Sequence, residues 1–239
     1  MRLLIFGGTG PTGARLIEQA LDAGHHVTAV ARDPARLPVT AGVTHGTARL
    51  PSAHDPATRD PARPAGAGHD RLTAVSDDVL RPGAWQDAVA GQDAVVSCLG
   101  TRDRRHPTTV YSRGTGTIVS AMRTAGVRRL VCLSSAGLDI PPGTPLAQRL
   151  VTRLVVQRLY RHAYADMAVM ERLVAESGLD WTVVRPPMLT DGPLTGRYRT
   201  AAGTHLERGS RISRADLAHY LLHHLDDRDA WGRVVEISA

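Results

Sequence analysis

Short apolar segments alternate with amphipathic segments along most of the chain, which is the pattern of an α/β protein. Residues 2–6 form an apolar run of strand length. Apolar residues then recur at helical spacing at Ala14, Leu16, Ile17, Ala20 and Leu21, and Gly24 ends that pattern. Residues 26–31 are rich in β-branched side chains and predict a second strand. The chain therefore opens with a strand–helix–strand unit.

The same alternation resumes after residue 71 and continues to the end of the chain. Strands are predicted at 72–75, 93–99, 129–134, 179–185 and 234–237. Helices are predicted at 82–89, 108–125, 148–160, 165–176 and 213–225. Strands that alternate with helices form a parallel sheet covered on both faces. We predict a single Rossmann-type domain over residues 1–239, with a doubly wound parallel sheet, helices on both faces and a small C-terminal substrate lobe.

Residues 40–70 interrupt this pattern. The stretch is rich in Pro, Ala and Gly, has almost no large apolar residues, and contains prolines at positions 51, 56, 61 and 64. A short helical start near Pro34 and a weak strand near Val43 are predicted before it. The rest is predicted to be a flexible insertion, and a functional lid and an inert surface loop both remain open.

Composition narrows the class of protein. No apolar run among the 239 residues reaches the ~18–20 residues of a membrane span, and only six residues precede the first glycine motif. Cys98 and Cys132 lie in apolar segments, which favours reduced thiols in the core. These features predict a cytoplasmic protein with no membrane partner.

The charge pattern points to a small ligand. The formal net charge is +6, and all 29 basic residues are arginines, scattered along a chain with only 4% aromatic residues. Such a chain lacks the aromatic-rich and zinc-knuckle motifs of nucleic-acid binders, and its 11 histidines show no metal-ligand spacing. We expect no nucleic-acid partner, no metal, and a phosphate-bearing small molecule; the oligomeric state stays open.

The strongest motif is a glycine cluster between the first strand and the first helix. Residues 7–13 read Gly-Gly-Thr-Gly-Pro-Thr-Gly and contain the Gly-x-Gly-x-x-Gly pattern in its proper context. Glycines allow a tight turn and a close approach to pyrophosphate, whose charge the helix N-terminus stabilises. The predicted contacts to a dinucleotide are Gly7, Thr9, Gly10, Pro11, Thr12 and Gly13.

The end of the second strand selects the dinucleotide. Arg32 stands where an acidic residue would bind a ribose hydroxyl, and Arg36 follows. A guanidinium suits a 2′-phosphate by charge and by its fork of donors. Asp33 could instead accept from the hydroxyl, so NAD(H) stays an alternative, but we predict NADP(H).

Two further segments follow predicted strands and complete the expected cofactor site. Asp78 can accept from the adenine amino group while Val79 packs on the ring. Leu99, Gly100, Thr101 and Arg102 end the fourth long strand at the carboxyl edge of the sheet, where ligands bind in open α/β folds.

These motifs together resemble the atypical short-chain dehydrogenase/reductases. The chain is similar to NADPH-dependent biliverdin-IXβ/flavin reductases and to NmrA-like NAD(P)H-binding proteins over nearly its whole length, except the 40–70 insertion. The matching segments are 7–13, 31–33, 78–79, 99–102, 134–136, 176–187, 189–196 and 212–218, of which 176–187 is the most specific.

The resemblance implies where the cofactor and the substrate lie. NADP would be held by Gly10, Thr12 and Arg32, and nicotinamide would lie near Leu99, Gly100, Ser134 and residues 186–189, which include Pro187 and Met188. Flavin- and bilin-reducing relatives place a serine near the substrate, and Ser134 matches it. Those relatives also carry an Asp-His pair, which here is Asp166-Met167, and this difference disfavours bilin reduction.

The catalytic chemistry is limited by the absence of lysine. Short-chain dehydrogenases use a tyrosine whose pKa is lowered by a lysine four residues later, and this chain contains no lysine. Tyr164 could donate a proton unassisted, although a structural core or surface tyrosine is the favoured interpretation. Together with Ser134, which the resemblance places near the substrate, it is a catalytic candidate. Hydride transfer to a flavin or quinone needs no strong acid and rests on proximity.

We therefore predict an NADPH-dependent reductase of a flavin, quinone or other conjugated small molecule. A non-catalytic NADP(H)-sensing regulator of the NmrA-like kind is one alternative. An enzyme that performs non-redox chemistry on a biosynthetic intermediate is another.

Overall fold

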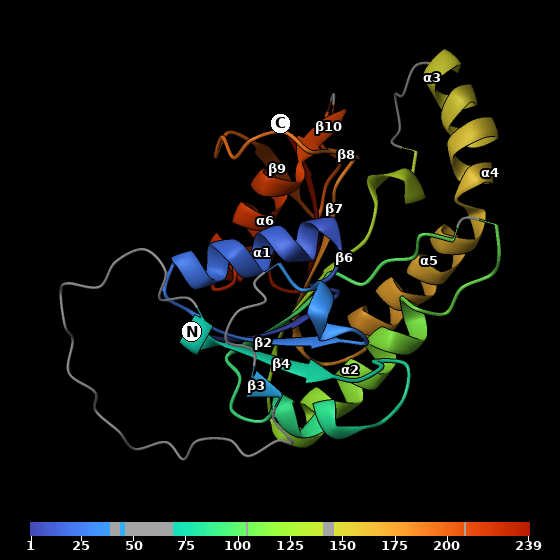
Figure 1. Ribbon diagram of the computed structural model, residues 1–239. Coiled ribbons are helices and arrows are strands. Elements are labelled where there is room, and N and C mark those ends of the chain that lie inside the picture. Colours follow the sequence, from blue (N-terminus) through green and yellow to red (C-terminus); the bar gives the residue numbers. More distant parts are fainter. Residues whose placement is uncertain (39–43, 46–68, 104, 141–145, 208) are drawn as a thin grey trace.

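A parallel sheet forms the centre of the computed structural model, which describes residues 1–38, 44–45, 69–103, 105–140, 146–207 and 209–239 (Figure 1). Its strands follow the order β3-β4-β2-β1-β5-β6-β7-β11-β9. Their bounds are β1 (Arg2–Phe6), β2 (His26–Ala31), β3 (Thr44–His45), β4 (Leu72–Ser76), β5 (Ala94–Ser97), β6 (Arg129–Leu133), β7 (Asp180–Arg185), β9 (Arg199–Ala202) and β11 (Arg233–Ser238). All neighbours in this sheet are parallel except β11 and β9.

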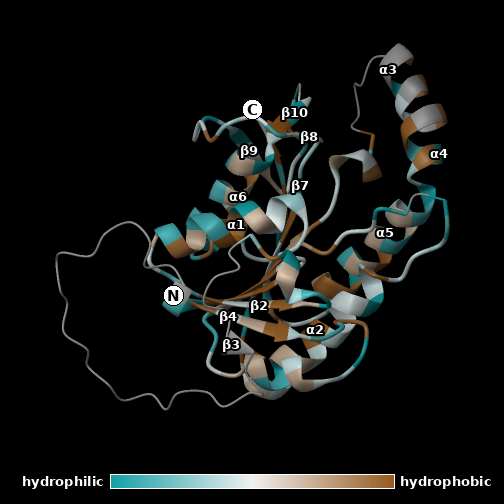
Figure 2. Ribbon diagram, viewed as in Figure 1, coloured by the Kyte–Doolittle hydropathy of each residue, from teal (hydrophilic) through white to brown (hydrophobic). Residues whose placement is uncertain are grey.

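Helices cover both faces of the sheet. On one face α1 (Pro11–Asp22) packs against α6 (Arg214–His223), and on the other α2 (Ser112–Ala125) packs against α5 (Arg161–Ala175). Because side chains alternate along a strand, β1 contributes to both cores. Leu3 and Ile5 join the core under α1 and α6, and Leu4 and Phe6 join the core under α2 and α5. The apolar strands appear brown at the centre of Figure 2.

The chain ends its first two long helices with glycine. Pro11 occupies the first turn of α1, where its fixed φ suits a helix start, and Gly24 follows the helix with a φ of 81°. Gly126 ends α2 at a φ of 72°, and the amide of Val127 then donates to the carbonyl of Met122. After each of these two glycines the chain enters the next strand of the sheet, β2 or β6.

Short elements complete the fold. Short 3₁₀ segments occur at η1 (Pro34–Arg36), η2 (His69–Arg71), η3 (Ala84–Val89), η4 (Ala136–Leu138) and η6 (Arg228–Ala230). α3 (Leu146–Val151), the π-helical η5 (Thr152–Val156) and α4 (Gln157–Leu159) follow one another directly. A second small sheet pairs β8 (Met188–Thr190) with β10 (Arg211–Ser213) in parallel. Within the described ranges, no helix combines the length and apolar character needed to cross a bilayer.

The predicted α/β fold is confirmed, with local corrections. The helix predicted at 82–89 is the 3₁₀ segment η3, and the helix predicted at 148–160 is interrupted by η5. The sheet is not wholly parallel, because β9 pairs antiparallel with β11. The sequence analysis missed β8, β9 and β10, which have three or four residues each, too few for a periodic pattern. Most of the predicted insertion at about 40–70 lies outside the described residues.

A buried carboxylate organises the C-terminal segment around β8 and β10. Asp216 on α6 is 2% exposed and accepts hydrogen bonds from the amides of Thr195 (2.7 Å) and Gly196 (2.8 Å) and from the Thr195 hydroxyl (2.9 Å). Ser213 caps α6, since its hydroxyl accepts from the Asp216 amide at 2.9 Å. Asp216 thus ties the loop before β9 to α6, instead of returning to the cap residue as in a capping box.

We predict that Asp216→Asn lowers the free energy of unfolding at pH 7 by about 1.5–3 kcal/mol, because charge-assisted hydrogen bonds are lost. Burial alone would raise the pKa of Asp216, but the hydrogen bonds from Thr195 and Gly196 bring the pKa below its ordinary value. This stabilisation is therefore present above an unfolded-state pKa of about 3.9 and is lost as the pH falls through the lower folded-state pKa.

Urea unfolding of the variant and of the wild type at pH 7 and at about pH 3 measures this effect. The difference between the two proteins should shrink at the lower pH. The control is Asp22→Asn, at an exposed position, which should be neutral. An equal effect at both pH values would contradict an ionised Asp216.

Candidate functional site

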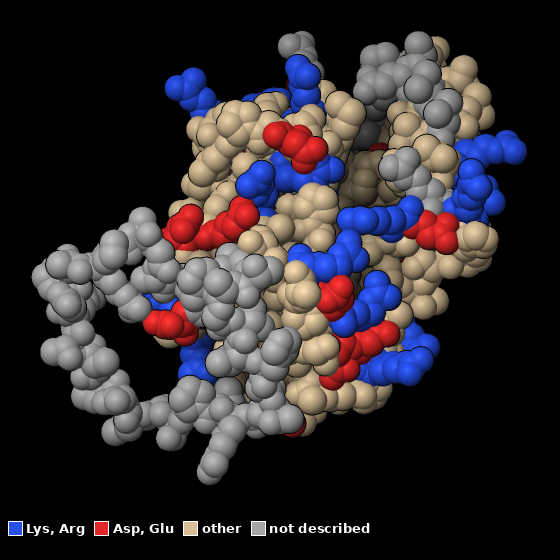
Figure 3. All heavy atoms as spheres, viewed as in Figure 1, with Lys and Arg blue, Asp and Glu red and all other residues tan. Residues whose placement is uncertain are grey.

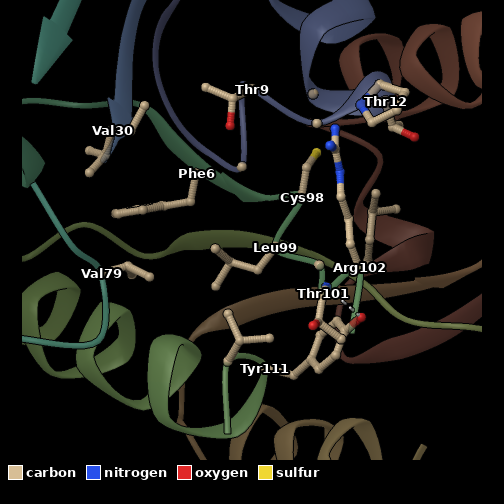
Figure 4. Close-up of a pocket in the computed structure, with 18 of the residues that line it drawn as sticks. Phe6, Thr9, Thr12, Val30, Val79, Cys98, Leu99, Thr101, Arg102 and Tyr111 are labelled. Atoms are coloured by element: carbon tan, nitrogen blue, oxygen red, sulfur yellow. Dashed lines mark hydrogen bonds between the residues drawn. The ribbon is translucent and has the colours of Figure 1, made fainter. Parts of the chain in front are cut away.

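A cavity of about 620 Å³ lies at the carboxyl edge of the sheet (Figure 4). Its walls come from the segments that follow β1, β2, β4, β5, β6 and β7, together with the starts of α1, α2 and α6 and one residue of α5. In an open α/β sheet this edge collects the loops that bind ligands. The predicted cofactor residues that line it are Gly7, Thr9, Gly10, Pro11, Thr12, Gly13, Arg32, Arg36, Asp78, Val79, Leu99, Gly100, Thr101, Arg102 and Ser134.

The glycine turn packs backbone against backbone. Gly7 has a φ of 78°, and its carbonyl oxygen accepts from the amide of Gly10 at 2.9 Å. A Cβ on Gly13 would overlap the Gly7 carbonyl oxygen, and a Cβ on Gly7 would overlap the Cys98 carbonyl oxygen. Only residues without a side chain allow this closeness, which brings the first turn of α1 to the cavity.

The N-terminus of α1 is open to an anion. No side chain caps it, its first turn contains no acidic residue, and Gly10 is the cap residue. The amides and the helix dipole at this end favour a negative group such as pyrophosphate. The Arg102 side chain extends toward this turn, near Thr12 (Figure 4). The residues present therefore fit the diphosphate of a dinucleotide.

Arginines lie at the β2 end of the cavity. Arg32 and Arg36 both line it and are exposed. The Asp33 carboxylate turns away to cap η1, where it accepts from the amide of Ala35 at 3.2 Å, and it is not part of the lining. Asp78 also lines the cavity, and its Oδ1 accepts from the amide of Leu80 at 3.0 Å. Val79 is 9% exposed beside it.

The end of the cavity near β6 is apolar and contains one polar atom without a partner among the described residues. Leu133, Met167, Pro186 and Leu189 supply apolar wall. The Ser134 hydroxyl is buried, and no group of the described residues bonds to it. Its backbone is held, because the amide of Ser134 donates to the Val184 carbonyl at 2.8 Å. Buried polar atoms are almost always paired, so this hydroxyl on a cavity wall is available to a bound ligand or to a water molecule.

Three predicted site residues lie outside the cavity lining. Tyr164 places its hydroxyl 3.4 Å from the Ser135 hydroxyl and against Gly137, and burial raises its pKa. Met188 is 64% exposed, and Pro187 precedes it. Side chains alternate along β8, so Leu189 points to the cavity while Met188 points to solvent.

The Asp166-Met167 pair is split between two roles. Asp166 is buried, and its Oδ2 accepts from the amides of Tyr111 (2.9 Å) and Ser112 (3.3 Å) while the Ser112 hydroxyl donates to its Oδ1. A carboxylate from α5 therefore caps the N-terminus of α2. Met167, the next residue, lines the cavity with a thioether. The acid is structural and the wall beside it is apolar.

The sequence analysis missed several lining residues, chiefly Tyr111, Cys98 and Arg214. Tyr111 is 6% exposed, its hydroxyl accepts from the Thr101 amide at 3.4 Å, and burial raises its pKa. Both cysteines are free thiols, as predicted, and burial raises the pKa of Cys98 to about 12, so it stays protonated. No local motif marks Tyr111, which reaches the site from the residue before α2. In the described part of the chain, no cluster of three His, Cys, Asp or Glu residues could hold a metal.

Comparison with known proteins agrees with this geometry. A family model described as NAD(P)H-binding matches residues 7–58 and 50–228, which together span most of the chain. The chain belongs to this NAD(P)H-binding family. As a member of it, the protein has a nicotinamide dinucleotide site, and the glycine turn and the open N-terminus of α1 are the parts of the cavity that suit one.

Two curated proteins are related to this NAD(P)H-binding protein. An uncharacterized chloroplastic protein of Arabidopsis thaliana is 28% identical over 241 residues, covering 100% of this chain and 76% of the relative. A 3-diazoavenalumate denitrifying reductase of a Streptomyces species is 33% identical over 208 residues, covering 86% of this chain and 61% of the reductase. The chain thus spans less than two thirds of that reductase.

Solved structures share the Rossmann fold of the family. A short-chain dehydrogenase/reductase of Veillonella parvula in complex with NADP matches with a TM-score of 0.73 and 17% identity, covering 100% of this chain and 94% of that one. A Streptococcus pneumoniae protein assigned as an NADH-flavin reductase matches with a TM-score of 0.67 and 20% identity, covering 100% of this chain and 99% of that one. At these identities the likeness establishes the fold, which confirms the predicted resemblance at that level.

We predict that Gly13→Ala weakens binding of a nicotinamide dinucleotide at least tenfold, because the added methyl would push the Gly7 carbonyl and open the turn. Fluorescence titration of NADPH measures the change. Gly116→Ala on α2 is the control, since its Cβ would make ordinary contact at 3.4 Å with Leu173. Unchanged binding in Gly13→Ala would show that the turn does not hold the dinucleotide.

Proposed function

We propose that the protein is an NADPH-dependent reductase that transfers hydride to a flavin, a quinone or another conjugated small molecule. One observation carries the proposal. A single cavity joins an arginine end, a glycine turn with an open helix N-terminus, and an apolar end where the buried Ser134 hydroxyl has no partner among the described residues. A dinucleotide phosphate suits the first two parts, and a flat, weakly polar acceptor suits the third.

The proposed preference for NADP(H) rests on the different positions of the basic and acidic residues that follow β2. Arg32 and Arg36 face the cavity, whereas the Asp33 carboxylate is engaged by the Ala35 amide at 3.2 Å. An acid that is already a turn cap is poorly placed to accept from a ribose hydroxyl. Two guanidinium groups beside the adenine position supply the donors and the charge that a 2′-phosphate needs.

The proposed class of acceptor follows from the side chains at the apolar end of the cavity, which exclude water and include no activated general acid. Bound NADPH supplies hydride, and the chain has to position the acceptor and exclude water. Leu133, Pro186 and Leu189 exclude water, and the hydroxyls of Ser134 and Tyr111 offer neutral hydrogen bonds. No lysine exists to lower the pKa of a tyrosine, and Tyr164 is not in the lining. Acceptors that stabilise added electrons by conjugation need no strong acid and fit this environment.

The related proteins support a reductase of this kind. The Streptomyces relative is by name a reductase of a diazo compound. The Streptococcus protein that shares the fold is assigned to flavin reduction. Both names describe reductases, which is the class of activity proposed for this chain.

NADPH oxidation with riboflavin, FMN and simple quinones tests the proposal against its alternatives. Turnover with any of these acceptors, faster with NADPH than with NADH, supports it. Tight NADP(H) binding without turnover of any acceptor would favour a sensing regulator. Conversion of a substrate with no net change in NADPH would favour non-redox chemistry.

We predict that Arg32→Ala weakens NADPH binding by about 1.5–3 kcal/mol and leaves NADH binding nearly unchanged, because only NADPH carries the phosphate. Titration of each cofactor into the variant measures both effects. Arg197→Ala, at an exposed position outside the cavity, is the matched control. An equal loss for both cofactors would contradict the role of Arg32.

We predict that Tyr164→Phe changes the turnover rate less than about tenfold with a flavin or quinone, since a general acid contributes about 10²–10⁴-fold. Ser134→Ala should lower kcat/KM by a factor that corresponds to about 0.5–1.5 kcal/mol, the value of one neutral hydrogen bond. Steady-state NADPH oxidation from pH 6 to 9 measures both variants. A thousandfold loss in Tyr164→Phe with intact NADP(H) affinity would instead indicate carbonyl reduction through that tyrosine.

A further inference from the structure

A helical arm extends from the body of the protein beside α5 (Figure 1). It consists of α3, η5 and α4, which together run from Leu146 to Leu159. The Gln157 side chain anchors it, donating to the carbonyl oxygens of Gly137 and Leu138 at 3.3 Å each. The arm is therefore attached to η4, which follows the segment that carries Ser134, and its other end points away from the sheet.

The arm exposes large apolar side chains at one per turn. Leu146 is 82% exposed, Leu150 58% and Leu154 57%. Successive members of this leucine stripe stand four residues apart, so they follow one another along the same side of the helix. Scattered exposed leucines are ordinary, but a contiguous apolar stripe in water is a mark of an interaction surface.

The charge around the stripe has one sign. Residues 140–165 contain four arginines (Arg149, Arg153, Arg158 and Arg161) and no Asp or Glu, so this stretch carries +4 of the formal net charge of +6. Arg149, Arg158 and Arg161 are exposed. In Figure 3, blue arginine side chains lie at the right of the view, at the lower end of the arm near α4.

The leucine stripe and the positive charge near it together favour one kind of partner. A second copy of the chain is disfavoured, because pairing two arms would bring arginines against arginines. A helix with leucines on one side and only basic residues among its charged groups is typical of helices that lie on anionic lipid. The arginine stems are apolar, so they can lie along the acyl boundary while the guanidinium groups reach the headgroups.

We propose that this arm binds the protein to the surface of a membrane that contains anionic lipids. The contact is peripheral, and it runs against the expectation, drawn from the sequence, that the protein has no membrane partner. It does not depend on the proposed reductase activity, because the residues that line the cavity do not include the leucine stripe or the arginines of the arm.

Co-sedimentation of the full chain with vesicles tests the proposal. Wild-type protein should bind vesicles of phosphatidylglycerol and phosphatidylcholine at low salt and should not bind phosphatidylcholine alone. The triple variant L146Q/L150Q/L154Q should bind at least tenfold more weakly. R149Q/R158Q should lose about fivefold for each arginine, roughly 25-fold in all, and this loss should shrink at high salt.

Matched controls separate the arm from general effects. Leu194→Gln changes a leucine that is 50% exposed elsewhere, and Arg197→Gln removes an exposed arginine outside the arm; both should bind vesicles as the wild type does. Far-UV circular dichroism and NADPH binding report whether each variant is folded. If the triple variant does not fold, Leu146→Gln, at the most exposed position, is expected to lower vesicle binding by itself.

Three outcomes would overturn the proposal. One is the absence of wild-type binding to anionic vesicles, or equal binding to neutral vesicles. Another is a concentration-dependent dimer in sedimentation velocity that the triple variant abolishes, which would assign the arm to a second copy. The third is binding to polyglutamate that is lost in the arm variants, with no binding to vesicles, which would assign it to an acidic protein.

Discussion

The close packing of three stretches of backbone at the head of the sheet positions everything else in the site. Gly7, Gly13 and the Cys98 carbonyl meet at distances that exclude any Cβ. This contact holds the end of β1 against the segment after β5 and turns α1 so that its uncapped N-terminus faces the cavity. A side chain at either glycine would separate the helix from the strand, and with it the amides from any bound phosphate.

Throughout the fold the protein uses arginine where a strong cation is needed, because it has no lysine. Arg185 is largely buried and pairs with Glu171 at 2.5 Å, and it also reaches Asp139. Arg129 is buried against the carbonyls of Leu225 and Asp180, and burial lowers its pKa to about 10, which still leaves it charged at neutral pH. Guanidinium groups keep their charge under such burial, whereas an ammonium group would release its proton far more readily.

The helix α5 shows how one segment can serve the scaffold and the site at once. The Asp166 carboxylate caps the N-terminus of α2, which begins beside the cavity. The residue before this helix, Tyr111, lines the wall of the cavity. Met167, one residue later, faces the cavity. Met167 makes the wall beside the cap apolar, which is in line with the conjugated acceptor proposed above.

The sequence by itself determined the strand–helix alternation, the glycine turn and the cofactor family, because each depends on local patterns. Gly7 to Gly13 must form a turn wherever they follow a buried strand, and Arg32 must stand at the end of β2. Tertiary structure decided what depends on distance across the fold. It brought Tyr111 and Arg214 into the lining, left Tyr164 and Met188 outside it, and assigned Asp33 and Asp166 to caps. It also paired β8 with β10 and left the leucines of α3 uncovered. Except for the Asp33 cap, which joins neighbouring residues, such contacts join residues tens of positions apart, and no periodicity within a short segment encodes them.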